Sequence, residues 1–515
     1  MKIAHPYCYA LSLATLLCFS AATLRAQYYD ITRFGAKGDG VTDNTAAIQQ
    51  AIDSCAITGG KVYFPAGKFL TATLQLRSNI TVHVSAGATV LANTDISKYP
   101  HLDAGIPFYG ELWARQAVFF GKQLDNITLE GSGTLDGQGA SFVITTDKKP
   151  ERYMNRPYLL WFAGCTNVTV KDLQLRNSAF WMQHYLGCSF VNISGLRIWN
   201  HSNKNNDMMD IDGCRYVTIS NIIGDSDDDG ITIKSTSPLV SEYITVTNCV
   251  LSSHCNALKF GTESTGGFRN ITVSNCIIKP SGQTSTIYGK PAGISGVALE
   301  MVDGGIMENV AINNLVIEGT EVPLFIRLGN RARKYRESAA QPGKGVLRNV
   351  HLSNILATGS AGIGCALVGL PGSPIEEISL SNISIQSAGG GKAADMGKII
   401  EEKEKDYPEA TMFGVLPAYG FYVRHATGLR LNDIRLRYKE NEDRPAIVLS
   451  DVKGFSVSGL EAQTGSNTPA AVYAEQSSNG VLFQSVQSSG TPLLKTGKGA
   501  VNISVTGNSM KSGKK

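Results

Sequence analysis

The sequence predicts an all-β fold: a single-stranded, right-handed parallel β-helix with an N-terminal capping helix. Three observations predict it, namely a recurring strand unit, cysteines at fixed places within successive units, and a composition suited to short strands and tight turns. The unit holds two aliphatic residues with one residue between them, as in Val168–Val170, Val217–Ile219 and Ile271–Val273. Most units lie 23–28 residues apart, with three longer intervals of 39, 40 and 51 residues. A recurring period of that length is typical of a solenoid.

The repeated element is a strand, because apolar residues within each unit alternate with Thr, Ser or Asn. Cysteine supports the register. Cys165, Cys188 and Cys214 each lie three residues before the first aliphatic residue of their unit, and Cys249 and Cys276 each lie five residues after theirs. Equivalent residues on successive turns stack about 4.8 Å apart. We therefore expect ladders of buried thiols that act as small apolar side chains.

Composition favours one long coil over several globular domains. The 515 residues include 54 Gly and only 17% charged residues, and the repeat crosses every candidate domain boundary. We predict a leader at 1–26, an N-terminal cap with the first turns of the coil at 27–125, and the main β-helix at 126–505. The 39-residue and 51-residue intervals predict loops near 281–309 and 385–428.

Residues 1–26 predict a cleaved secretory signal. Lys2 begins a short basic region, residues 11–24 are apolar but too short to span a bilayer, and Ala26 precedes the cleavage point. A membrane anchor is the alternative. Export would place the protein in the periplasm or outside the cell. Removal of Lys2 and Arg25 lowers the formal charge from +4 to +2, so attraction of an acidic polymer would need a local patch.

The segment before the repeats predicts a cap. Asp43 is placed to N-cap a helix that runs through Ala46, Ile48, Ala51 and Ile52. Such a helix would cover the first turn, whose open edge would otherwise invite aggregation.

Three polar clusters between Asn205 and His254 predict a site. Asp207, the pair Asp228 and Asp229, and His254 lie about one turn of the repeat apart, so they should become neighbours in the stacked coil. Crowded carboxyl groups repel, which raises the pKa of at least one of them. One protonated and one ionised carboxyl group are what the hydrolysis of a glycosidic bond requires.

The order of the motifs resembles glycoside hydrolase family 28, the polygalacturonase family, over nearly the whole chain after the leader. The motifs are Phe34–Asp43, Gly131–Gly137, Asn177–Trp181, Asn205–Asp207, Asp228–Asp229 and His254. The resemblance implies a right-handed parallel β-helix and inverting hydrolysis of pectic polymers, with 126–505 as the catalytic domain. It also implies that Asp228 is the general acid, that Asp207 and Asp229 activate water, and that His254 supports the acid.

Backbone spacing and the resemblance predict different stereochemistry. Carboxylates on adjacent turns would lie about 5 Å apart, the spacing of retaining enzymes, whereas inverting pairs lie about 6.5–9.5 Å apart. Side-chain directions can widen a gap that backbone spacing does not fix, so we predict inversion.

The chain departs from the family where the sugar carboxylate is held. The family's Arg-Ile-Lys corresponds here to Arg327-Leu328-Gly329, which keeps the arginine and lacks the lysine. Arg331 or Lys259 could supply the second cation, or the site could accept a neutral sugar such as rhamnose. The histidine motif also differs, since Ser-His-Cys replaces Gly-His-Gly.

Further substrate-binding candidates are charged residues with apolar neighbours. Lys259, Glu300 and Arg327 should point outward into one groove if the strand alternation holds, and the alternative is a solvated strand face. Tyr422 and Arg424 lie at the closing end of the loop predicted at 385–428, and we predict that they contact sugars. Long loops on a solenoid commonly form one wall of a cleft, although a mobile surface insertion is the alternative. A loop that closes one end of the groove would favour release of terminal sugars.

Three functions remain open. The first is an exported glycosidase that acts on galacturonan or rhamnogalacturonan. The second is a polysaccharide lyase on the same fold, in which the acids would hold Ca²⁺. The third is a noncatalytic carbohydrate-binding β-helix. We predict the first, acting as a monomer with a pectic polysaccharide or oligosaccharide as partner and without a cofactor or metal. The sequence contains no nucleotide-binding loop and no metal-thiolate spacing, and no basic stripe suggests binding to nucleic acid. No segment after the leader suggests a membrane span.

Overall fold

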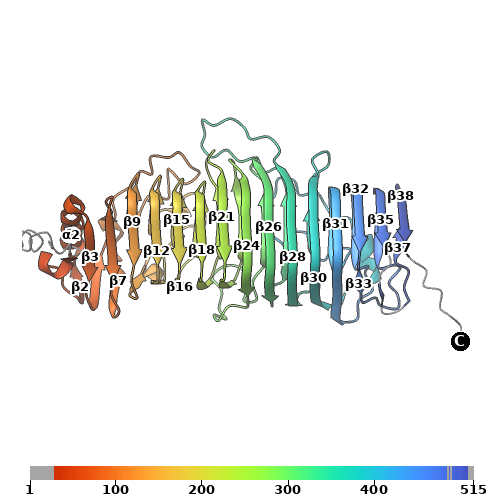
Figure 1. Cartoon of the computed structure of the whole chain (residues 1–515), viewed down its shortest axis with the longest axis horizontal. Coiled ribbons are helices and arrows are strands. Elements are labelled where there is room, and N and C mark those ends of the chain that lie inside the picture. The colour runs from red at the N-terminus through yellow and green to blue at the C-terminus, as the bar shows by residue number, and fades with distance from the viewer. Residues whose placement is uncertain (1–27, 484–485, 488–489, 508–515) are drawn as a thin grey trace, which may run out of the picture.

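The computed structural model describes residues 28–483, 486–487 and 490–507. These residues form one long coil of parallel strands, which Figure 1 shows from β2 at one end to β38 at the other. The predicted parallel β-helix is confirmed. The predicted leader at 1–26 lies outside the described residues. Within the described part of the chain, no helix is long and apolar enough to cross a membrane.

The first of three strand ladders contains the predicted units. Val168 pairs with Val191, and Val191 pairs with Val217, so the first aliphatic residues of successive units lie in register. The strands of this ladder are β1 (Tyr28–Asp30), β3 (Gly60–Phe64), β6 (Ile80–Val84), β9 (Asp125–Glu130), β12 (Thr166–Lys171), β15 (Ser189–Ser194), β18 (Arg215–Ser220), β21 (Ser241–Thr247), β24 (Phe268–Ile278), β26 (Ile306–Glu318), β28 (Val346–Ser360), β30 (Ile375–Gly389), β31 (Phe421–Glu440), β32 (Ile447–Ser458), β35 (Ser478–Phe483) and β38 (Val501–Thr506).

The second ladder follows the first around the coil, and the long strands β24 to β31 continue from one ladder into the next. The remaining strands of the second ladder are β2 (Asp39–Asp43), β4 (Gly67–Thr71), β7 (Ala88–Ala92), β10 (Thr134–Asp136), β13 (Gln174–Arg176), β16 (Arg197–Asn200), β19 (Ile223–Ser226), β22 (Val250–Ser253), β33 (Glu461–Ala462) and β36 (Val486–Gln487).

The third ladder completes each turn, and its strands carry most of the residues considered below. They are β5 (Leu74–Gln75), β8 (Ala117–Lys122), β11 (Tyr158–Ala163), β14 (Gln183–Leu186), β17 (Met209–Asp212), β20 (Ile231–Ser235), β23 (Asn256–Ser264), β25 (Ser295–Met301), β27 (Val322–Leu328), β29 (Cys365–Val368), β34 (Val472–Glu475) and β37 (Leu494–Thr496). The first residues of β31 and β32 continue this ladder between β29 and β34.

Asparagine marks the turn between the first two ladders. Asn248, Asn275, Asn314, Asn354 and Asn382 all have φ between 53° and 57°, a left-handed conformation that Asn tolerates better than most residues. Their side chains also bond along the coil, and the Asn314 amide donates to the Asn275 Oδ1 at 2.6 Å. The Asn of the repeat unit is therefore a turn residue.

The predicted thiol ladders are confirmed. The Cys188 backbone N–H donates to the Cys214 Sγ at 3.2 Å, and all eight cysteines among the described residues are free and buried. They fill the interior beside the aliphatic ladders.

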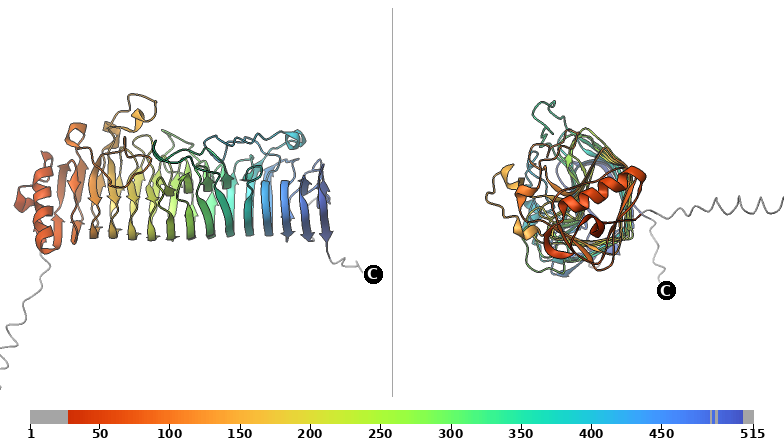
Figure 2. Two further views of the ribbon diagram at one scale, coloured as in Figure 1. Left: turned by 90° about the horizontal axis from the view of Figure 1, so that it is seen from above. Right: turned by 90° about the vertical axis from the view of Figure 1, so that its left-hand side faces the viewer.

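The predicted helix is α2 (Thr45–Thr58), and it lies across the N-terminal end of the coil (Figure 2). It buries Ile48, Ala51 and Ile52. The N-cap position is Asn44, so the prediction of Asp43 is wrong by one residue. The Asp43 carboxylate still accepts the Thr45 N–H at 3.0 Å, because the Asn44 side chain is occupied with the backbone of Lys37.

Insertions leave the coil at four main places. These are 93–116, 137–157, 329–345 and 390–420, and 279–294 forms a shorter connection. The predicted loop at 281–309 is partly wrong, since β25 lies inside it and pairs with β23 and β27. The predicted loop at 385–428 likewise includes the end of β30 and the start of β31.

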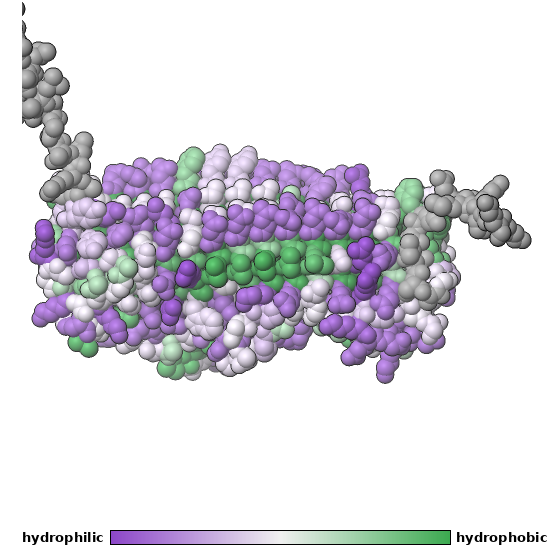
Figure 3. All heavy atoms as spheres, turned by 60° about the horizontal axis from the view of Figure 1, so that its bottom comes forward, coloured by the Kyte–Doolittle hydropathy of each residue, from purple (hydrophilic) through white to green (hydrophobic). Residues whose placement is uncertain are grey.

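Among the described residues, no insertion covers the outer face of the second ladder over five turns. Ile223, Val250, Ile277, Val316 and Leu356 share one register there. Figure 3 shows an apolar band between hydrophilic rows on this side of the molecule. Ile277 is 45% exposed.

Candidate active site

The predicted acids meet at the start of two third-ladder strands. Asp207 precedes β17, and Asp228 and Asp229 precede β20. Because β17 and β20 pair Met209 with Ile231, Asp207 lies beside Asp229 on the next turn. All three carboxyl groups line one pocket of about 310 Å³. The sequence spacing therefore brings the three acids together as predicted.

The carboxyl groups of this pocket are buried, with only 2%, 7% and 4% of Asp207, Asp228 and Asp229 exposed. One oxygen of Asp228 lies within 4.8 Å of one of Asp229. Burial, with the Asp229 charge added to it, raises the pKa of Asp228 to about 6. Burial also raises the pKa of Asp207 well above its usual range, and its Oδ1 has no hydrogen-bond partner. The pocket therefore keeps these two carboxyl groups protonated to a higher pH than water does.

Asp229 differs because both of its carboxylate oxygens have close hydrogen-bond donors. Its Oδ2 lies 2.9 Å from the Lys259 Nζ, and its Oδ1 accepts from the Asn256 side chain at 2.7 Å. These contacts hold the Asp229 side chain in place. The pocket thus contains two acids whose pKa is raised by burial and a third whose two oxygens both have close hydrogen-bond donors.

A second buried cation links the acids. The Lys234 Nζ lies 3.5 Å from Asp207, 3.3 Å from Asp210 and 3.6 Å from Glu263. It also lies 4.1 Å from the centroid of the Trp181 ring. Burial raises the pKa of Asp210 to about 8.

The prediction that His254 supports the acid is wrong. Its Nδ1 lies 2.9 Å from Asp227 and its Nε2 lies 2.9 Å from the Gln283 carbonyl oxygen. The reason is register. β20 and β23 pair Ile231 with Leu258, which aligns His254 with Asp227 and leaves a different residue beside Asp229.

That residue is Asn256, which sequence reasoning missed. It donates to Asp229 and accepts from the Ser295 hydroxyl at 2.7 Å. The carboxyl group of Glu409, from the 390–420 segment, also interacts electrostatically with Asp229 and Lys259. Burial raises the pKa of Glu409 to about 7, and the negative charge of Asp229 adds to the effect of burial.

Asp227 and its neighbours fix the 279–294 connection. Its two carboxylate oxygens accept the backbone N–H groups of Ile287 and Tyr288 at 2.9 and 2.8 Å. Despite burial, the nearby His201, the hydrogen bond from His254 and the two backbone N–H groups lower the pKa of Asp227 to about 2. This connection places Tyr288 in the wall of the pocket.

The structure divides the predicted substrate-binding residues. Arg331 lines the pocket, with its Nε donating to Asp303 at 2.9 Å. Lys259 and Glu300 lie behind Asp229, buried and 3.6 Å apart. Burial raises the pKa of Glu300 well above its usual range. Lys259 contacts Asp229, Glu300 and the Tyr407 hydroxyl. It therefore fixes the positions of Asp229 and Glu300.

Arg327, Tyr422 and Arg424 lie outside the pocket, which corrects their predicted role. Arg327 donates to the Glu402 carbonyl oxygen at 2.6 Å, and Arg424 donates to the Ile400 carbonyl oxygen at 2.6 Å. Tyr422 is buried. Arg327 and Arg424 instead anchor the 390–420 segment to the coil, since a buried guanidinium needs acceptors.

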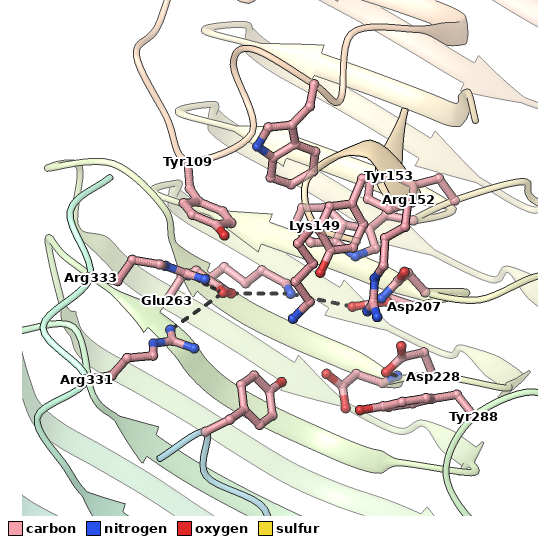
Figure 4. Close-up of a pocket in the computed structure, with 17 residues that line it drawn as sticks. Tyr109, Lys149, Arg152, Tyr153, Asp207, Asp228, Glu263, Tyr288, Arg331 and Arg333 are labelled. Atoms are coloured by element: carbon pink, nitrogen blue, oxygen red, sulfur yellow. Dashed lines mark hydrogen bonds and ion pairs between the residues drawn. The ribbon is translucent and has the colours of Figure 1, made fainter. Parts of the chain in front are cut away.

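Several pocket residues lie on insertions that the repeat pattern could not place (Figure 4). In the sequence, the aromatic residues at 108–113 and the basic residues at 148–152 could have indicated that these insertions contribute to the site. The residues missed by sequence reasoning are Tyr109, Trp113, Lys149, Arg152, Tyr153, Glu263, Tyr288, Arg333 and Tyr407.

Two clusters among the described residues offer three metal-ligand atoms each. One is His201, Asp227 and His254, and the other is Asp228, Asp229 and Cys255. The second suits Ca²⁺ poorly, because calcium prefers oxygen ligands and Lys259 already neutralises Asp229.

Comparison with known proteins decides the family. The profile of Glycosyl hydrolases family 28 matches residues 55–404. The chain belongs to glycosyl hydrolase family 28. A probable polygalacturonase of Vitis vinifera is 31% identical to this family 28 chain over 230 residues, which are 42% of the chain and 46% of the relative. An exo-poly-alpha-D-galacturonosidase of Dickeya chrysanthemi is 37% identical over 119 residues, 21% of the chain and 19% of the relative.

The matched parts span less than half the length of each of these two curated relatives. Among solved structures, an exopolygalacturonase from Thermotoga maritima superposes with a TM-score of 0.60 at 22% identity, covering 80% of this chain and 92% of that one. At this identity the superposition supports the fold of the family 28 chain, a right-handed parallel β-helix.

Proposed function

We propose that this family 28 chain hydrolyses glycosidic bonds in a pectic polysaccharide, either galacturonan or rhamnogalacturonan. The observation that carries the proposal is the convergence of Asp207, Asp228 and Asp229 on one pocket in different electrostatic settings. Two of the three carboxyl groups favour the proton and the third has a lysine partner. Glycoside hydrolysis needs such an unequal set.

In the proposed reaction, Asp228 gives its proton to the leaving oxygen as the glycosidic bond breaks. Asp229, assisted by Asp207, accepts a proton from the attacking water. The water attacks from the face opposite to the leaving group, so the anomeric configuration inverts. Lys259 and Asn256 contact the two oxygens of Asp229 and fix its position.

The pocket's walls support attack at a chain end. Trp113 comes from the 93–116 insertion, Arg333 from 329–345, and Tyr407 from 390–420. Insertions from distant parts of the coil therefore surround the acids. A polymer end fits such an enclosure better than the middle of a chain does. Some relatives are named as exo-acting enzymes, which agrees with this proposal.

Export and a monomeric state are also proposed. The export proposal rests on the basic and apolar pattern of residues 1–26.

To test this proposal, the purified protein is incubated with polygalacturonan and with rhamnogalacturonan. Reducing-end release, ultraviolet absorbance and product size are measured together, and the anomer formed first is identified by NMR. Reducing ends without ultraviolet absorbance, with single sugars as the first products, are expected. An ultraviolet product would show a lyase instead, and a ladder of sizes would contradict attack at chain ends. Binding without turnover would indicate a noncatalytic protein.

A further inference from the structure

The cations of the pocket fall into two sets. The first set is Lys234, Arg331 and Arg333, which all surround Glu263 at 3.6, 3.8 and 2.6 Å. Arg331 and Arg333 also pair with Asp303. These positive charges are therefore already balanced by carboxylates of the protein.

The second set is Lys149 and Arg152, on the 137–157 insertion. Within the described part of the chain, neither forms an ion pair with a carboxylate, and the Arg152 Nε is buried without a hydrogen-bond partner. Of the two acids nearest in the sequence, Asp147 lies 2.8 Å from Lys204 instead, and Glu151 is exposed and forms no ion pair among the described residues. Burial, and then the charge of Arg152, lower the pKa of Lys149. Two neighbouring cations without an anion are electrostatically unfavourable.

The insertion is itself held in place, and it packs the Arg152 side chain against an aromatic ring. The Arg152 guanidinium lies 4.9 Å from the centroid of the Tyr153 ring, which in turn packs 4.7 Å from the Trp113 ring. The Asn203 side chain donates to the Gly139 and Phe142 carbonyl oxygens at 2.9 and 2.7 Å. The cations are therefore presented by a segment fixed by packing and hydrogen bonds.

Their position faces the reacting groups. Figure 4 shows Lys149 and Arg152 on the side of the pocket above Asp207 and Asp228, with Arg331, Arg333 and Glu263 on a different wall. A sugar placed for protonation by Asp228 would lie between these walls. Its anionic group could reach only the unpaired cations without displacing a protein carboxylate.

We propose that Lys149 and Arg152 bind the free carboxylate of a uronate sugar in this pocket, and so select an acidic sugar over a neutral or esterified one. This inference rests on the proposed function, since it names the sugar that the hydrolase accepts. Lys149 and Arg152 take the place of the missing lysine of the Arg-Ile-Lys motif, whose arginine, Arg327, faces the 390–420 segment.

Binding is measured by calorimetry with a galacturonate oligomer and with its methyl ester, using full-length protein that carries Asp228→Asn to stop turnover. The background should prefer the acid oligomer. Lys149→Met and Arg152→Gln should each weaken its binding about 10- to 100-fold, the effect of losing a charged hydrogen bond. Lys149→Arg should retain most of the affinity.

Lys148→Met is the matched control, because Lys148 is the neighbouring lysine in the sequence and does not line the pocket. It should bind like the background, and thermal unfolding should show that each variant is folded. The proposal is overturned if Lys149→Met and Arg152→Gln bind the acid oligomer as tightly as the background does. It is also overturned if the background binds neither oligomer or prefers the ester. Failure of the wild-type protein to release reducing ends would contradict the hydrolase alone, since binding is measured separately.

Discussion

Two polar layers lie next to each other at the same corner of the coil, and they differ in how completely their hydrogen bonds are satisfied. In one layer Asp227 meets His254 and two backbone N–H groups, and its pKa falls to about 2. In the other, Asp228 and Asp207 are buried with few donors, and the pKa of Asp228 rises to about 6. A saturated acid stays ionised and fixes structure, whereas an unsatisfied acid can hold and transfer a proton.

The largest expected effect comes from Asp228→Asn. Loss of a general acid lowers the rate by about 10²–10⁴-fold, so reducing-end release should fall by about 10³-fold. The fold should remain, because burying a neutral amide at this position costs less than burying a carboxylate. Wild-type turnover by a folded Asp228→Asn variant would show that another group donates the proton.

Asp227→Asn should act on stability. Removing one partner of a buried charged pair costs about 3 kcal/mol, and the new amide would face the Ile287 and Tyr288 N–H groups. Urea unfolding should show this loss, while the variant keeps most of its activity at temperatures where it is folded. Equal stability with lost activity would reverse the roles of the two layers.

The two layers should also respond to pH with opposite signs. The pKa of Asp227 is lowered in the folded state, so its stabilisation is present above about pH 4 and is lost as pH falls toward 2. The pKa of Asp228 is raised, so its contribution is present at low pH and is lost as pH rises through about 6. As Asp228 must be protonated to act, kcat/KM should fall above that pH, about tenfold per unit. A flat profile from pH 5 to 8 would contradict this.

The smallest effect is expected on the apolar band of the second ladder. Ile277→Thr replaces one β-branched, half-exposed side chain with another, so the free energy of unfolding should change by less than about 0.5 kcal/mol. A thermal melt suffices to check it. A loss of several degrees would mean that this face is covered in the folded protein.

The sequence predicted most of the fold because a parallel coil repeats its pattern locally. The alternation around Val168 and Val217 identifies strands, and the stacked cysteines report the register without any structure. Asp207, Asp228 and Asp229 could be placed together for the same reason. These predictions depend only on spacing between neighbouring turns.

Spacing failed where the register shifts or where the chain leaves the coil. His254 is two residues from the position beside Asp229, and only strand pairing shows that Asn256 lies there. Arg327 lies on a strand face that predicts exposure, but the 390–420 segment covers it. Lys149 and Arg152 come from an insertion whose path no repeat determines.

The protonation of Asp227 and Asp228 tests the difference between the layers most directly. Carbon-13 labelling of aspartate, with Asp227→Asn and Asp228→Asn for assignment, allows each carboxyl carbon to be followed by NMR against pH. We predict that the Asp228 resonance titrates near pH 6 and that Asp227 remains ionised to about pH 2. An Asp228 carboxyl group that is already ionised at pH 5 would contradict its role as the general acid.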